Sequence, residues 1–214
     1  MRFSTYSNIS IAPLIKELRS DGTAELHFIH GPVEAFPPEG YETFFGQGPY
    51  FRFMAARNEK SGDDVLDRIR NFPVGATPED QMRELMSGGG ESVPYSVNDI
   101  ILAKQSARDA VDYLYDIMAR DGPFDGIIGY SEGATIAATL LLHEQRRFEL
   151  YGIEPMLKCA LFFAGWPPLT PDFDQLVLAD QCDLTITVPT CHISKLQTVR
   201  YGDNKLTHTN SWVS

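Results

Sequence analysis

The chain has 214 residues, enough for one α/β domain with a buried core and short for two. Its 43% hydrophobic and 22% charged content is ordinary for a soluble globular protein, and its net charge of −11, without any cluster of Lys and Arg, argues against a nucleic-acid partner. No apolar run approaches the ~20 residues of a membrane span, and the polar first ten residues exclude a secretory signal, so we expect a cytoplasmic protein with no membrane partner.

Apolar periodicity and turn residues predict alternating helices and strands. Helices are expected over residues 9–20, 63–70, 79–86, 97–120 and 134–148, and strands over 24–29, 124–128, 158–163 and 184–193. Strands that alternate with helices imply an α/β fold with a doubly wound, mostly parallel sheet. We expect one domain over residues 1–214.

Residues 34–94 differ in character from the rest and predict an insert above the sheet. The insert holds two adjacent prolines, three adjacent glycines and a run of aromatic residues: Tyr41, Phe44, Phe45, Tyr50, Phe51 and Phe53. Aromatic residues over an active site favour a lid or an acyl pocket. Core packing of an irregular subdomain is the alternative, and the sequence leaves both open.

The sequence Gly129-Tyr130-Ser131-Glu132-Gly133 lies between an expected strand and an expected helix. A sharp strand-to-helix turn with this pattern is the nucleophile elbow of α/β hydrolases, in which strained backbone presents the serine and close packing requires glycine on either side. The N–H of Glu132 would then stabilise an oxyanion. The alternative is an ordinary turn in which Ser131 only caps the helix.

The three cysteines, Cys159, Cys182 and Cys191, lie in or near apolar runs, which predicts buried free thiols. The five histidines are scattered, and no pair has the spacing of metal ligands along a helix. We therefore expect no metal and no cofactor.

The chain resembles the FSH family of serine hydrolases, small α/β hydrolases common in fungi. The resemblance covers roughly residues 11–193 and is carried by residues 27–32, 50–53, 129–134, 161–168 and 188–193. It implies the α/β-hydrolase fold and an esterase or thioesterase acting on a small acyl ester or thioester. Because some members release polyketides, it also implies secondary-metabolite biosynthesis with a polyketide synthase as partner.

Three departures from the family pattern predict a chain truncated at both ends relative to the family. The opening strand that ends in Leu-His-Gly and supplies an oxyanion N–H is missing, and His30-Gly31 follows the next strand instead. Gln197 falls where the family has the triad aspartate. The chain ends at Ser214, before the segment that carries the base histidine, and residues 194–214 form an atypical polar tail.

The tail offers substitutes for the missing triad residues. Asp203 and His208 keep the Ser…Asp…His order of α/β hydrolases, although they are only five residues apart. Two polar residues in a loose tail are the alternative. His192 is another candidate base, but its position within an expected strand favours a core histidine.

The sequence thus leaves two main hypotheses. In the first, Ser131 attacks an ester or thioester, with Asp203 and His208 completing the triad. In the second, the chain is a hydrolase-fold remnant or binding protein without a complete triad. An acyltransferase using the same serine is a third reading, which sequence does not separate from hydrolysis.

Overall fold

The computed structural model describes residues 8–20, 22, 24–36, 42–43, 46–55, 77–87 and 97–193. Its elements, in chain order, are α1 (Asn8–Ser20), β1 (Val33–Ala35), β2 (Tyr50–Arg52), α4 (Pro78–Ser87), α5 (Val97–Asp121), β3 (Gly126–Tyr130), α6 (Glu132–Tyr151), β4 (Cys159–Phe163) and β5 (Thr190–Ile193). Helices and strands alternate from α5 to β4, as the sequence predicts.

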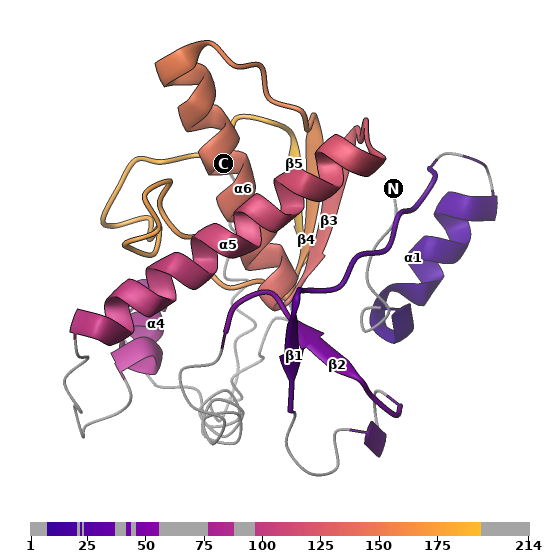
Figure 1. The fold of residues 1–214 in the computed structure, drawn as a ribbon, viewed down its shortest axis with the longest axis horizontal. Coiled ribbons are helices and arrows are strands. Elements are labelled where there is room, and N and C mark those ends of the chain that lie inside the picture. The colour runs from indigo at the N-terminus through magenta and orange to yellow at the C-terminus, as the bar shows by residue number, and fades with distance from the viewer. Residues whose placement is uncertain are drawn as a thin grey trace, which may run out of the picture.

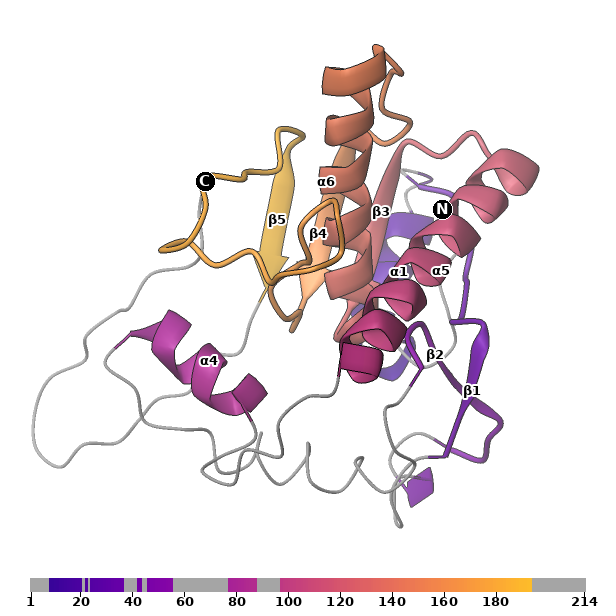
Figure 2. The same ribbon diagram turned by 60° about the vertical axis from the view of Figure 1, so that its left-hand side comes forward.

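The strands β3, β4 and β5 form a parallel sheet in that order, with Ile128 opposite Leu161 and Leu161 opposite Cys191. In Figures 1 and 2 this sheet lies between α6 on one side and α1 on the other. The predicted α/β arrangement with a parallel sheet is therefore confirmed. Because the strands are parallel, their carboxyl ends meet at one edge, where such folds bind ligands.

Helix α6 is the centre of the core because nine consecutive residues, 134–142, are buried on all sides of it. The helix packs along β3 and β4, and α5 packs against α6. Small side chains on α5 (Ala107 and Ala110, both fully buried) allow the two helices to approach closely. The elbow helix is thus fixed by the sheet on one side and by α5 on another.

The strands β1 and β2 form a separate antiparallel pair, with Val33 opposite Arg52 and Ala35 opposite Tyr50. Apolar periodicity does not predict these two strands, because each has only three residues. In Figure 1 the pair lies near the end of the parallel sheet to which the β3 and β4 arrows point. This described part of the insert therefore lies beside the carboxyl edge of the sheet.

The four predicted helices that fall on described residues are confirmed, with boundaries displaced by at most three residues. The strand expected over 124–128 is displaced by two residues, because the turn after α5 extends through Gly122, whose N–H donates to the Met118 carbonyl. The strand predicted over 158–163 is confirmed and begins one residue later. The helix predicted over 63–70 lies outside the described residues.

Two strand predictions are wrong in part. Residues 24–29 form no regular strand, since only His27 makes a single bridge, but the buried Leu26 adds to the core. In the predicted region 184–193, residues 184–188 are irregular and only β5 pairs with β4. At 24–29 the apolar pattern reflects the burial of Leu26, which does not require a strand, whereas at 184–188 no residue is buried and Leu184 is 38% exposed, so the apolar pattern there was misleading.

Glu144 is a buried carboxylate that connects α6 to the segment before β4. It is 3% exposed and accepts hydrogen bonds from the backbone N–H groups of Met156 (3.0 Å) and Leu157 (3.4 Å). Burial raises the pKa of Glu144 above its ordinary value. Since the folded chain then holds this proton more tightly than the unfolded chain, the contribution of Glu144 to stability is fully present below its ordinary pKa and falls as the pH rises through the raised pKa.

We expect Glu144→Ala to lower the free energy of unfolding by about 1–3 kcal/mol at about pH 5, because it leaves two backbone donors without an acceptor. The difference should be smaller at neutral pH. Urea unfolding followed by circular dichroism measures it. The control is Glu149→Ala on the same helix, whose side chain is 50% exposed and whose replacement should cost less than about 0.5 kcal/mol. Equal effects of the two changes would contradict the role of Glu144.

Candidate active site

Ser131 is the junction between β3 and α6, and its backbone is strained. Its φ of 52° and ψ of −122° lie in a region that residues with a side chain rarely adopt. The Ser131 N–H donates to the Phe163 carbonyl at 2.8 Å, and the Ser131 carbonyl accepts from Ala134 N at 2.9 Å and Thr135 N at 3.3 Å. The neighbouring strand and the first turn of α6 therefore hold this conformation from both sides.

Close packing at the turn explains the first glycine of the pattern. A Cβ on Gly129 would lie 2.4 Å from Ala134 Cα and 2.7 Å from the Gly133 carbonyl oxygen, so only glycine fits there. A Cβ on Gly165, after β4, would lie 2.7 Å from Ala134 Cβ. The strand, the helix and the next loop thus converge on Ala134.

The second glycine of the pattern has a different neighbour from the one the sequence suggested. We expected nearby backbone to require glycine at both positions, but a Cβ on Gly133 would meet only Phe53 Cε2, at 3.4 Å. Phe53 follows β2, so the ring comes from the insert. An aromatic side chain therefore lies against the first turn of α6, two residues after Ser131.

The Ser131 side chain does not cap α6. It makes no hydrogen bond to the helix N-terminus, so the capping alternative does not describe this serine. No described residue accepts a hydrogen bond from the Glu132 N–H, one of the first donors of the helix. A hydroxyl that lies beside a helix N-terminus without capping it suits a nucleophile that generates an oxyanion.

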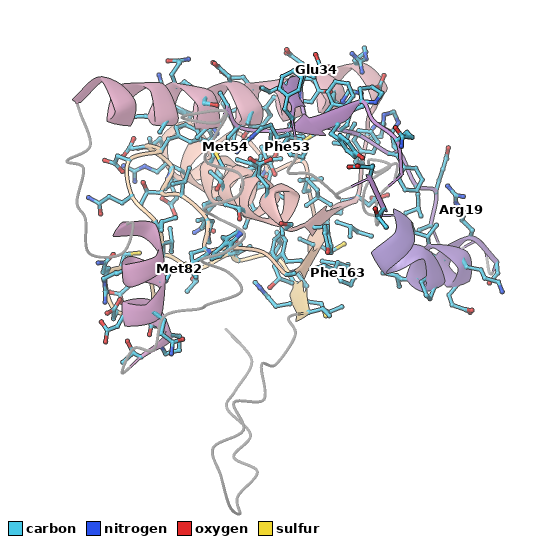
Figure 3. The ribbon with its side chains drawn as sticks, turned by 90° about the horizontal axis from the view of Figure 1, so that it is seen from below. Arg19, Glu34, Phe53, Met54, Met82 and Phe163 are labelled. Atoms are coloured by element: carbon cyan, nitrogen blue, oxygen red, sulfur yellow. The ribbon has the colours of Figure 1, made fainter. Side chains whose placement is uncertain are left out.

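The Glu132 carboxylate binds the chain that leaves β2, a contact that the sequence analysis missed. It accepts hydrogen bonds from Phe53 N at 2.8 Å and Met54 N at 3.4 Å, and it lies 3.5 Å from Arg52 Nη2. Figure 3 shows Phe53 and Met54 side by side. We expected Glu132 to contribute mainly its backbone N–H, and no sequence pattern connects its side chain to partners about 80 residues away.

Two buried threonines of α6 hold the loop after β4. Thr135 Oγ1 accepts from Trp166 N and donates to the Trp166 carbonyl, both at 3.1 Å. Thr139 Oγ1 accepts from Leu169 N at 2.9 Å. These contacts fix the loop that begins at Ala164, whose φ of 48° is also positive, beside the elbow.

The predicted partners of Ser131 are not brought to it within the described residues. Asp203, His208 and Gln197 lie outside the described residues, so the structure says nothing of their positions. His192 is on β5, exposed, with its ring 5.0 Å from that of Phe162. The expectation of a core histidine is therefore wrong, because β5 pairs on one side only among the described strands.

The other described histidines have partners of their own. His27 Nε2 lies 3.4 Å from Asp121 Oδ2. His143 Nδ1 lies 3.1 Å from the Tyr115 hydroxyl, and burial lowers the pKa of His143. The His30 ring stacks on Phe51, and no described histidine forms a hydrogen bond with Ser131.

The described residues contain no group of three or more His, Cys, Asp or Glu that could hold a metal ion. None of the helices described is long and apolar enough to cross a membrane. The cysteines are free thiols, but Cys159 and Cys182 are only partly buried and Cys191 is exposed, so the expectation of buried thiols is wrong.

A family model described as Serine hydrolase (FSH1) matches residues 10–194. The chain belongs to this serine hydrolase family. It is 35% identical over 99 residues to the hydrolase phiM of a fungal species (strain ATCC 74256), a match that covers 45% of this chain and 47% of that protein. It is 28% identical over 196 residues to the esterase FUS5 of Gibberella moniliformis, covering 89% and 59% of the two chains.

The matches thus span about half of the length of these curated relatives. No solved structure matches the chain. Family membership confirms the resemblance drawn from the sequence, and it agrees with the parallel α/β arrangement around the Ser131 turn.

We expect Gly129→Ala to destabilise the fold by about 3 kcal/mol or more, since the added methyl group would overlap the backbone of Ala134. Thermal unfolding followed by circular dichroism measures the change. Gly133→Ala is the matched control, because its methyl group would only touch the Phe53 ring, and it should cost about 1 kcal/mol or less. A Gly129→Ala protein as stable as the control would contradict the packing described for the elbow.

Proposed function

We propose that the chain is a serine hydrolase that cleaves a carboxylic ester or thioester through a Ser131 acyl-enzyme. The observation that carries the proposal is the positive φ of Ser131 at the β3–α6 junction, with its hydroxyl uncommitted to capping. Strain of this kind persists where the surrounding structure requires it and is common at active sites. The names of the relatives, hydrolase and esterase, support the same class of reaction.

The geometry of the turn supports a reaction in two steps. Ser131 Oγ attacks the acyl carbon and gives its proton to a histidine base, which passes the proton to the leaving alcohol or thiol. The Glu132 N–H and the N-terminus of α6 stabilise the oxyanion of the tetrahedral intermediate. Water then attacks the acyl-enzyme and releases the acid.

For the remaining triad members we propose His208 as base and Asp203 as acid. The support is the chain order Ser…Asp…His and the other contacts of the four described histidines, none of which bonds to Ser131. Asp203 and His208 follow β5 in the chain, and β5 ends at the same edge of the sheet as the elbow strand.

We propose an acyl chain, including a polyketide chain, as the substrate group, and a polyketide synthase as a partner in secondary-metabolite biosynthesis. The support is the family resemblance and the aromatic residues of the insert, of which Phe53 lies against the elbow. In this proposal the insert covers the acyl site of a single cytoplasmic domain. An aromatic ring beside the nucleophile favours an apolar acyl group over a charged one.

A second candidate is a hydrolase-fold remnant that binds acyl compounds without cleaving them. It is favoured by the lack of any hydrogen bond between Ser131 and a described histidine. The two candidates differ in turnover: the remnant would bind an ester and leave it intact.

We expect Ser131→Ala to abolish hydrolysis of p-nitrophenyl butyrate, a loss of at least about 10³-fold in kcat/KM, because no other group replaces the nucleophile. Initial rates of nitrophenol release measure it. Ser20→Ala is the control, because the exposed Ser20 hydroxyl donates to the Glu17 carbonyl in α1, and this variant should keep its activity. Activity that survives Ser131→Ala would exclude this serine as the nucleophile.

We expect His208→Ala to lower kcat for the same ester by about 10³-fold or more, since the serine loses its base. His192→Ala is the matched control, because His192 is exposed on β5 and should change kcat by less than about threefold. The reverse order of effects would make His192 the base instead.

A further inference from the structure

The chain that leaves β2 is held by three consecutive backbone donors. Phe53 N and Met54 N donate to the Glu132 carboxylate, and Ala55 N donates to Ser106 Oγ at 2.7 Å. The acceptors come from two different helices, α6 and α5. Three adjacent donors bound in this way leave the segment little freedom to shift along the elbow, and none of them is available to an oxyanion.

The end of β2, just before this segment, is packed tightly against residues 30–31. A Cβ on the buried Gly31 would lie 2.0 Å from the Arg52 carbonyl oxygen, so residues 30–31 pass directly against the backbone at the end of β2. The His30 ring stacks on Phe51 with centroids 4.3 Å apart and planes inclined by 27°. Residues His30 and Gly31 therefore pack against β2 and restrict its movement.

These hydrogen bonds and packing contacts place the Phe53 side chain against the elbow. Its ring edge would touch a Cβ on Gly133, and its backbone N–H makes the shorter of the two Glu132 bonds. Glu132 precedes Gly133 and follows Ser131, so one turn of α6 carries the proposed nucleophile, the carboxylate and the surface on which the ring rests.

We propose that Phe53 is a specificity-determining residue that limits the acyl side of the Ser131 site, and that the Glu132 carboxylate is the positioning residue that holds it there. The proposal rests on the proposed function, in which Ser131 receives the acyl group. The backbone hydrogen bonds keep the segment that carries this ring from moving away from the elbow to admit a long chain, whereas an unanchored loop could move. The site should therefore discriminate between acyl chains by length.

The test compares kcat/KM for p-nitrophenyl butyrate and p-nitrophenyl octanoate in the full chain. We expect Phe53→Ala to raise the octanoate-to-butyrate ratio by about tenfold, within the range for a few methylenes in an apolar pocket. Glu132→Gln should shift the ratio in the same direction by about threefold or more, because an amide offers one acceptor oxygen in place of two. In the double variant the two effects should not multiply, since both act through the same ring.

The matched control is Glu144→Gln, which alters the same kind of contact, a carboxylate on two consecutive backbone donors, at the other end of α6. It should leave the ratio unchanged. A Glu132→Gln protein that loses activity on both esters equally, with no change in ratio, would overturn the positioning role. An unchanged ratio in Phe53→Ala would overturn the role of the ring.

Amide hydrogen exchange tests the hydrogen bonds from Phe53 and Met54 to Glu132 independently of enzymatic activity. We expect Glu132→Ala to accelerate exchange at Phe53 and Met54 by about tenfold or more, while Ala55, bound to Ser106, stays protected. Unchanged protection at Phe53 and Met54 would overturn the positioning role of Glu132. Inactivity of a folded wild type on both esters would instead contradict the proposed function, so the two failures are distinguishable.

Discussion

The hydrogen bond from the Ser131 N–H to the Phe163 carbonyl is the contact on which the site depends. It joins the end of β3 to the end of β4 at the point where the chain reverses into α6. Without it and the two bonds to the Ser131 carbonyl, nothing would compensate for a serine at positive φ. The tight turn also requires glycine at positions 129 and 165, because α6 starts so close to the ends of both strands that a Cβ at either position would overlap Ala134.

Side chains of helix α6 also hold other segments of the described structure in place. Near its start the Glu132 carboxylate holds the end of β2, and one turn later Thr135 holds the loop that follows β4. Further along, Glu144 holds the segment that leads into β4. Each contact satisfies backbone groups of an irregular segment, which would otherwise lose hydrogen bonds on burial. One rigid helix thus positions three segments around the elbow.

The sequence predicted the long elements because their signals are local. The apolar spacing of α5 and α6 and the glycines around Ser131 depend on neighbours in the chain, so helices, elbow and family followed from them. β1 and β2 were not predicted, since three-residue strands carry too little periodicity. The partners of Glu132 could not be predicted either, because contacts across about 80 residues leave no mark in a single sequence. His192 was misassigned because strand membership was taken to mean burial, whereas β5 has only one described neighbour.

Reaction of the folded chain with a fluorophosphonate, followed by digestion and mass spectrometry, shows whether Ser131 is an activated nucleophile. The reagent modifies a serine only where backbone geometry and a base together activate the hydroxyl. If Ser131 is the activated nucleophile, we expect one adduct, on the peptide that contains Ser131, at about one equivalent per chain. An adduct on another residue, or no adduct on a chain that circular dichroism shows to be folded, would contradict it.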